Sequence, residues 1–422
     1  MNAGQPLILP VTSLSLPAYQ SERLPNGMEL YALPGGNEPV LKMEIVFRAG
    51  AVFEKKTAVA EVMAGLLSEG TQQLSSADFA EKIEFLGSTL QTRGGVDTVR
   101  IKLFTLTRYF PQLIELIKDI IQFPAFDEQE LQVYINNKLE RLQIDLKKNE
   151  VLAYRHLTEI IFGKKHPYGR NPKPEDYLGI SANDLRDHHQ HFILPQNGMI
   201  FISGAYGEDV LENIRQVLGS WHTSQPNGVN QPNIHVAESS IGYFEMDGPQ
   251  SHQAAIRIGR RLFTQQHPDW NGLYVLNTIL GGYFGSRLMA EIRENLGLTY
   301  GIYSGIDSFS EDGCFYISTE TTTENIKTVI QAIRTETRKL QEVLIPENEL
   351  QMARNYLMGH LMTQLDGPFS TLDQIRSMKI ERLGDESFGE LVNTIQNISS
   401  GDLRDLAIRY LDLDQWATIV VR

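Results

Sequence analysis

The sequence predicts an α+β protein made of two tandem, homologous α/β-sandwich halves. Each half is expected to be a mostly antiparallel sheet covered by helices, and a linker joins the halves like the shells of a clam. Three observations predict this fold: the chain length, an internal repeat, and alternating strand and helix patterns. The chain has 422 residues, and single hydrophobic cores stop growing at about 250 to 300 residues. With 41% apolar and 21% charged residues, the composition is that of a globular protein.

The internal repeat is visible as two pairs of similar segments. Residues 180–187 read ISANDLRD, and residues 398–405, which begin 218 positions later, read ISSGDLRD. Residues 127–132 (DEQELQ) match residues 346–351 (PENELQ) at an offset of 219. Nearly equal offsets indicate that the two halves contain the same elements in the same order.

Each half is expected to run through two strands, two helices, two strands, a series of long helices and a last strand. Alternating apolar residues predict the strands, and apolar residues at helical spacing predict the helices, including a buried row from Leu113 to Ile121. The first-half strands are expected at 28–33, 41–48, 88–94, 97–105 and 199–203. The second-half strands are expected at 241–246, 253–260, 299–309, 313–319 and 417–421.

The boundary between the halves is expected in a polar segment. Residues 221–233 read WHTSQPNGVNQPN, and this mixture of polar residues, Pro and Gly is typical of linkers. The predicted organisation is a first half at 1–221, a linker at 222–239 and a second half at 240–422. Binding sites often lie between domains, so we expect a cleft between the halves.

Charge and cysteine content exclude several classes of function. The 38 basic and 52 acidic residues give a net charge of -14, which opposes binding to nucleic acid or to an anionic membrane. Cys314 is the single cysteine, so neither an intramolecular disulfide nor a cysteine-built zinc or iron–sulfur site is expected. The sequence lacks a membrane-spanning apolar run. A cytoplasmic location is the default expectation, and a periplasmic one applies if a signal peptide was removed.

Several motifs together resemble one protein family. In the first half they are residues 24–27 (LPNG), 44–50 (EIVFRAG), 58–71 (AVAEVMAGLLSEGT), 93–95 (RGG) and 166–169 (HPYG). In the second half they are residues 280–288 (LGGYFGSRL) and 291–300 (EIRENLGLTY). This order resembles the insulinase and pitrilysin type zinc peptidases, especially their mitochondrial-processing-peptidase-like branch. The resemblance covers nearly the whole chain.

The zinc signature of that family is degenerate in this sequence. The family carries H-x-x-E-H on a helix, where two histidines one turn apart bind zinc and the Glu acts as general base. The matching positions here are Glu61, Ala64 and Gly65. The region expected to give a third ligand reads KLERL at 138–142, where Glu140 is the one carboxylate. The resemblance therefore implies no metal and no cofactor in this chain.

The second family signature is retained. In active relatives an Arg and a Tyr seven residues apart hold the substrate and its oxyanion, and Arg293 and Tyr300 have that spacing. The resemblance implies a subunit that is inactive alone and pairs with a homologous zinc-binding peptidase subunit, as a heterodimer or larger assembly acting on peptides. The zinc would then lie in the partner.

Alternatives remain open at this stage. The chain could be a purely structural homolog, with Arg293 a surface residue and Tyr300 a half-buried strand residue, or a metallopeptidase using Glu61 and Glu140. Residues 89–96 could add a peptide strand at a sheet edge or simply form a turn. We expect His188, His189 and His191 to lie on a solvated helix face, and residues 281–286 to form a tight helix-to-helix turn.

Overall fold

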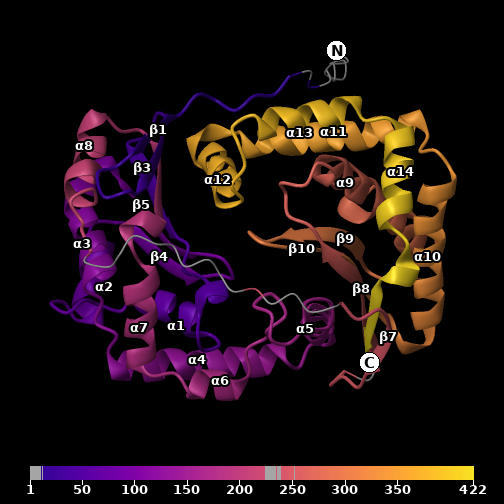
Figure 1. Cartoon of the computed structure of the whole chain (residues 1–422), viewed down its shortest axis with the longest axis horizontal. Helices are drawn as coiled ribbons and strands as arrows, with labels where there is room; N and C mark the ends of the chain where they lie inside the picture. The colour runs from indigo at the N-terminus through magenta and orange to yellow at the C-terminus, as the bar shows by residue number, and fades with distance from the viewer. Residues whose placement is uncertain (1–10, 12, 224–233, 235–238, 251) are drawn as a thin grey trace, which may run out of the picture.

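The computed structural model describes residues 11, 13–223, 234, 239–250 and 252–422. Most of the segment predicted as a linker, 222–239, lies outside the described residues. The remainder forms two sheets, each with its own set of helices, and Figure 1 shows them facing each other across the molecule. The predicted class of two helix-covered, mostly antiparallel halves is confirmed.

The first sheet has six strands in the order β1-β2-β6-β3-β5-β4. Neighbouring strands are antiparallel except for β2 and β6, which run parallel. The strand β1 was not expected from the sequence, because its four residues are all exposed and polar and give no apolar alternation. The bounds are β1 (Gln20–Arg23), β2 (Glu29–Pro34), β3 (Val40–Phe47), β4 (Thr89–Gly94), β5 (Val99–Leu106) and β6 (Gly198–Gly204).

The second sheet has five strands in the order β7-β11-β8-β10-β9. In this sheet β7 and β11 run parallel, as β2 and β6 do in the first sheet. The other neighbouring strands are antiparallel. Its order reproduces that of β2, β6, β3, β5 and β4, which confirms the duplication. The bounds are β7 (Gly242–Met246), β8 (Gln253–Leu262), β9 (Ile302–Ser308), β10 (Gly313–Thr322) and β11 (Ala417–Val421).

The helices of the first half pack mainly on one face of the first sheet. The predicted apolar row is confirmed in α3, where Leu113, Ile117, Ile120 and Ile121 are fully buried and Leu116 is partly buried. The bounds are α1 (Val59–Leu66), α2 (Ser76–Phe85), α3 (Phe110–Gln122), α4 (Glu128–Asp145), α5 (Asn149–Phe162), α6 (Pro174–Leu178), α7 (Ala182–Phe192) and α8 (Glu208–Val217).

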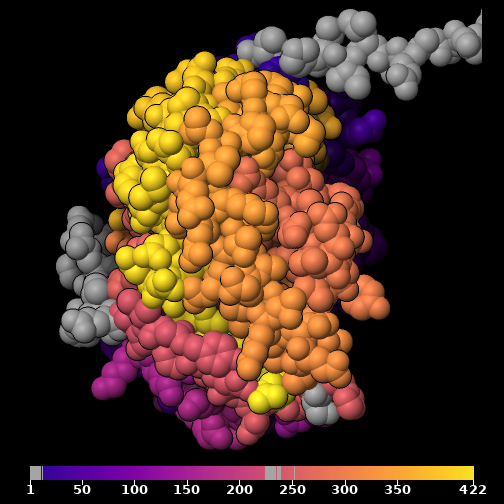
Figure 2. Space-filling view, turned by 90° about the vertical axis from the view of Figure 1, so that its right-hand side faces the viewer, coloured from indigo at the N-terminus to yellow at the C-terminus, as the bar shows by residue number. Residues whose placement is uncertain are grey.

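The second half repeats this series, and α10 and α14 lie side by side on its outer surface (Figures 1 and 2). Two π-helical turns, η4 (Thr278–Gly282) and η5 (Met289–Asn295), stand on either side of the predicted tight turn. The bounds are α9 (Trp270–Asn277), α10 (Ile326–Glu342), α11 (Glu347–Gln364), α12 (Gly367–Ile380), α13 (Ser387–Asn397) and α14 (Ser400–Tyr410). Among the described residues, no helix is both long enough and apolar enough to span a membrane.

The repeated sequence ISxxDLRD builds the same helix start twice. At α7 the Ser181 hydroxyl accepts a hydrogen bond from the backbone N–H of Asp184, whose carboxylate accepts one from the N–H of Ser181 at 2.8 Å. At α14, Ser399 and Asp402 make the same reciprocal pair. Each box satisfies backbone donors that the first helical turn leaves free.

The two halves exchange one helix each. The α5 helix of the first half places Ala153, Leu157 and Ile161, spaced one turn apart, against the second sheet, where they pack with Ala255 and Ile419. In return, Leu372 and Ile375 of α12 pack on the first sheet against Tyr31, Val46 and Phe201. Each sheet therefore has its own helices on one face and a helix of the other half on the opposite face.

We predict that shortening the α5 side chain at this contact destabilises the whole chain. Leu157 is fully buried, and a Cβ added at Gly259 on β8 would lie only 2.9 Å from its Cδ2 atom, so the helix and sheet are in close contact. Leu157→Ala should lower the free energy of unfolding by about 2–5 kcal/mol. Urea unfolding measures this, with Ile144→Ala at an exposed α4 position as control. Equal unfolding midpoints for both variants would contradict the packing.

Candidate functional site

The helix α1, where a degenerate zinc signature is expected from the sequence, is fixed at its start by a buried carboxylate. Glu54 accepts hydrogen bonds from the backbone N–H groups of Ala58 and Ala60, both at 3.0 Å, and pairs with Arg170 at 2.7 Å. Burial raises the pKa of Glu54 to about 7. Ala58 has a left-handed φ of 71°, and these contacts hold that strained residue in place. The α1 backbone is therefore rigidly set within the first half.

We use the term metal position for Glu61, Ala64 and Gly65, the positions at which the resemblance to the zinc peptidases implies zinc ligands and a base. Glu61 forms an ion pair with Lys138 of α4 and accepts a hydrogen bond of 2.7 Å from the Tyr177 hydroxyl. Its carboxylate is thus already held by two partners. Ala64 is completely buried in the core of the first half.

The space beside Gly65 is filled by an aromatic ring. A Cβ atom added at Gly65 would lie 2.2 Å from the ring of Tyr134, which projects from α4. No side chain fits there while that ring stays in place. The tyrosine thus occupies the volume into which a second histidine would have to extend.

The α4 helix brings basic side chains to this place. Lys138 and Arg141 line the metal position together with Tyr134, whereas Glu140 is exposed on α4 and is not part of that lining. Among the described residues, no group of three or more His, Cys, Asp or Glu side chains is arranged to hold a metal ion. The observed side chains do not fit a zinc ion, and the hypothesis that Glu61 and Glu140 form a metal site has no geometric support.

Tyr300 lies in a different place, in the second half. Its side chain is fully exposed and lines a cavity of about 860 Å³, which we call the Tyr300 cavity. The loop that carries it is tied to β10, because the Thr299 hydroxyl donates to the Glu320 carbonyl at 2.6 Å and the Thr321 hydroxyl donates to the Leu298 carbonyl at 2.7 Å. The phenol is thus presented to solvent from a fixed loop.

Arg293 is not part of the lining of the Tyr300 cavity. It lies in the π-helical turn η5, and its guanidinium stacks over the ring of Phe284 at 5.0 Å. Phe284 is itself largely exposed, so this cation–π pair lies at the surface. The structure therefore places Tyr300 in the lining of the Tyr300 cavity. Arg293 lies outside that lining and stacks on Phe284.

Three further charged residues of the Tyr300 cavity, Arg257, Glu150 and Glu320, were missed in the sequence. Arg257 on β8 is 6% exposed, and its Nε atom has no hydrogen-bond partner among the described residues. Glu150 reaches the same cavity from α5, the exchanged helix. The signal for Arg257 was a charged residue inside the apolar strand pattern of residues 254–258 (AAIRI). No comparable signal marks Glu150, because its position depends on the helix exchange.

The segment at 89–96 was expected either to form a sheet edge that accepts a peptide strand or to form a turn, and it contains both an edge strand and a turn. Residues Thr89–Gly94 form β4, an edge strand of the first sheet whose second edge is unpaired, and a turn follows. At Gly94 the backbone of α1 comes close, since an added Cβ would lie 2.6 Å from the Ala60 carbonyl oxygen. The unpaired edge can accept an added strand.

The expectation of a solvated histidine face on α7 was wrong. His188 and His189 are buried, and their Nε2 atoms lie 2.8 Å from the carbonyl oxygens of Ala49 and Ile121. Burial lowers the pKa of both imidazoles to about 4, so each is neutral and donates to its carbonyl. Only His191 is partly exposed. The reason is that α7 packs against α1, which the sequence of α7 alone does not reveal.

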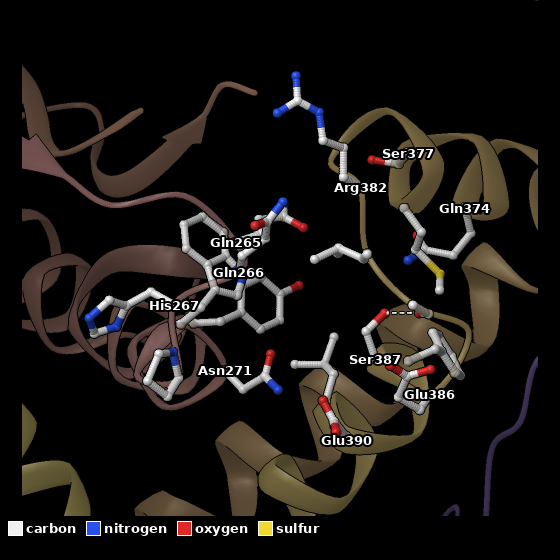
Figure 3. Close-up of a pocket in the computed structure, with 18 of the residues that line it drawn as sticks. Gln265, Gln266, His267, Asn271, Gln374, Ser377, Arg382, Glu386, Ser387 and Glu390 are labelled. Atoms are coloured by element: carbon white, nitrogen blue, oxygen red, sulfur yellow. Dashed lines mark hydrogen bonds between the residues drawn. The ribbon is translucent and has the colours of Figure 1, made fainter. Parts of the chain in front are cut away.

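Another cavity, of about 460 Å³, lies in the second half between the start of α9 and the helices α12 and α13. Figure 3 shows Gln265, Gln266 and Asn271 on one side and Gln374 and Ser377 on the other. Its lining includes neither the metal position nor Tyr300. It is therefore separate from the candidate site.

Comparisons with known proteins agree with this fold. The model of the insulinase family (peptidase family M16) matches residues 36–170, and that of the peptidase M16 inactive domain matches residues 179–357. Because these two matches together cover most of the chain, it belongs to the peptidase M16 family. The family resemblance seen in the sequence is thereby confirmed, and the finer assignment to the mitochondrial-processing-peptidase-like branch stays a prediction.

Individual relatives are distant but similar along most of their length. The chain is 20% identical to an uncharacterized zinc protease, YmxG, of Bacillus subtilis, over 84% of this chain and 85% of that protein. It is 22% identical to a Helicobacter pylori protein described as the non-peptidase homolog YmxG, over 91% and 89%. A crystal structure described as the peptidase M16 inactive domain from Pseudomonas fluorescens superimposes with a TM-score of 0.87 at 21% identity, covering 96% and 98%.

Because the Tyr134 ring fills the space beside Gly65, we predict that a Gly→Ala substitution there destabilises the protein instead of stabilising the helix. Gly→Ala within a helix normally stabilises by about 1 kcal/mol, and we expect this for Gly359→Ala on α11, where an added Cβ meets nothing within 4 Å. Gly65→Ala should instead destabilise by about 1–3 kcal/mol because of the Tyr134 ring. In Gly65→Ala/Tyr134→Ala the clash should disappear, giving a coupling of about 0.5–3 kcal/mol in chemical unfolding. Additive effects would show that the ring does not occupy this space.

The buried histidines predict a loss of stability in acid. Because the folded pKa of His189 lies at about 4 and the ordinary value is 6.5, the unfolded chain binds a proton that the folded chain does not as pH falls below 6.5. This should cost on the order of 2 kcal/mol between pH 7 and 4.5. His189→Gln keeps a donor for the Ile121 carbonyl and should flatten the pH dependence of thermal unfolding. His191→Gln, two residues away, should leave the pH dependence of thermal unfolding as in the natural protein. Equal pH dependence in the natural protein and both variants would show that His189 does not cause the loss of stability.

Proposed function

We propose that this chain is a non-peptidase subunit of the M16 family. In this proposal it binds peptides in its cleft, pairs with a homologous zinc-binding subunit and contributes Tyr300 and Arg293 to a composite site. The observation that carries the proposal is the contrast between the two halves. The metal position is filled by Tyr134 and by the Glu61–Lys138 pair, whereas Tyr300 is fully exposed in a cavity.

Each residue has a chemical role in this proposal. The zinc of the partner subunit would supply Lewis-acid activation of water. The Tyr300 hydroxyl can donate a hydrogen bond to the oxyanion that develops on the scissile carbonyl, and the Arg293 fork can hold a backbone carbonyl of the peptide. The buried Arg257 side chain adds a positive charge to the Tyr300 cavity, whose lining also holds the carboxylates of Glu150 and Glu320.

The description of the Helicobacter pylori relative as a non-peptidase homolog supports an inactive role for the isolated chain. One observation favours a second function, that of a scaffold: Arg293 stacks on Phe284 and is not part of the Tyr300 cavity lining. If the chain is a scaffold, neither Arg293 nor Tyr300 affects any proteolytic activity of the assembly. The location, cytoplasmic or periplasmic, stays a prediction that cell fractionation tests.

The test is a peptidase assay on an unfolded-peptide mixture. It compares this chain alone, an M16 subunit with intact H-x-x-E-H from the same organism alone, and the two together. We expect cleavage only with both chains. Tyr300→Phe should lower the kcat of the mixture about 100-fold through loss of an oxyanion donor, and Arg293→Ala should raise its KM.

The matched control is Tyr243→Phe, which removes an exposed hydroxyl on β7 that donates to Glu245 outside the Tyr300 cavity. This variant should leave the activity of the mixture unchanged. If mixing adds no activity, or if Tyr300→Phe behaves like Tyr243→Phe, the composite site is refuted and the scaffold function replaces it.

A further inference from the structure

The metal position opens into a cavity of about 450 Å³ that we call the cationic cavity. It lies between α1, β4 and α4, and its lining includes the Tyr134 ring and the backbone of β4 around Gly94. Its basic side chains come from two elements, Arg93 from β4 and Lys138 and Arg141 from α4. The charge of this lining therefore needs a physical explanation.

The charges of the cationic cavity do not cancel. Glu61 is the one carboxylate in the lining, and Lys138 already neutralises it. Within the described part of the chain, neither Arg93 nor Arg141 forms an ion pair or a hydrogen bond, and both side chains are exposed. Arg93 and Arg141 thus line this cavity without a paired carboxylate among the described residues, in a protein whose net charge is -14. Such a cavity repels a metal ion and attracts an anion.

The position of the cavity indicates what kind of anion can reach it. Arg93 and Gly94 belong to β4, the strand at the unpaired edge of the first sheet. A peptide added to this edge as an extra strand would run along β4 and past the mouth of the cavity. The two guanidinium forks have the planar geometry that binds a carboxylate through paired hydrogen bonds.

We infer that the cationic cavity is a carboxylate-binding site for extended peptides, formed in this chain by Arg93 and Arg141 in place of the zinc site. The carboxylate comes either from the C-terminus of the peptide or from an Asp or Glu side chain. This inference rests on the proposed function only in requiring that a peptide enters the cleft. It requires neither the partner subunit nor Tyr300.

The experiment measures binding of fluorescent peptides to the full chain alone by fluorescence anisotropy. One extended peptide sequence is prepared in four forms, with a free or amidated C-terminus and with Glu or Gln side chains. Replacing the responsible carboxylate by an amide should raise Kd about tenfold, since a hydrogen-bonded charge is lost. The C-terminal and side-chain arms show which carboxylate the site takes.

Variants of the full chain assign the effect to the cationic cavity. Arg93→Gln and Arg141→Gln should each abolish most of the tenfold difference between the acid and amide peptides. Arg338→Gln removes the same charge from an exposed position on α10, outside the cavity, and should leave the difference intact. Circular dichroism verifies that all three variants are folded.

Two outcomes overturn the inference: equal Kd values for all four peptides, or an acid–amide difference that persists in both Arg93→Gln and Arg141→Gln. Tyr243→Phe, which removes an exposed hydroxyl on β7 outside both the cationic cavity and the Tyr300 cavity, should bind like the natural protein in the same assay. Failure of the composite peptidase site with a retained carboxylate preference would refute the proposed function and leave this site standing. If the mixture of subunits cleaves peptides but the chain shows no carboxylate preference, the carboxylate site is refuted and the proposed function stands.

Discussion

The exchange of α5 and α12 between the halves is the packing interaction on which the rest of the structure depends. Each helix buries an apolar row against the sheet of the other half, with Leu157 on one side of the exchange and Ile375 on the other, both fully buried. Separating the halves would expose both rows to water at a cost that grows with apolar area. The same exchange carries Glu150 to the Tyr300 cavity, so the architecture and the candidate site share one cause.

The metal position is occupied by contacts of the chain's own side chains. The Tyr134 ring fills the volume beside Gly65, and the Lys138 ammonium group neutralises the Glu61 carboxylate in an ion pair. A carboxylate left unpaired in a partly buried place is costly, and an ion pair with a hydrogen bond from Tyr177 offsets this cost. The metal position is therefore a well-packed part of the first half, and a histidine placed at Gly65 would clash with the Tyr134 ring.

The sequence could predict much of the candidate site, though not its arrangement. The absence of imidazole at Ala64 and Gly65 is read directly from the residue letters, and so is the Arg293–Tyr300 spacing. Spacing alone could not tell that Tyr300 lines a cavity whereas Arg293 stacks on Phe284. That difference arises from a turn and a loop whose directions depend on contacts with distant strands.

By itself, the sequence determined the class of fold, the order of the elements and the duplication, because local apolar periodicity and repeated caps such as Ser181 and Ser399 act over a few residues. Only the tertiary structure decided the helix exchange, the burial of His188 and His189, and the filling of the metal position by Tyr134. These features join residues that are far apart in the chain. The energies of these contacts depend on which surfaces pack together in the folded chain, and local sequence patterns do not specify that packing.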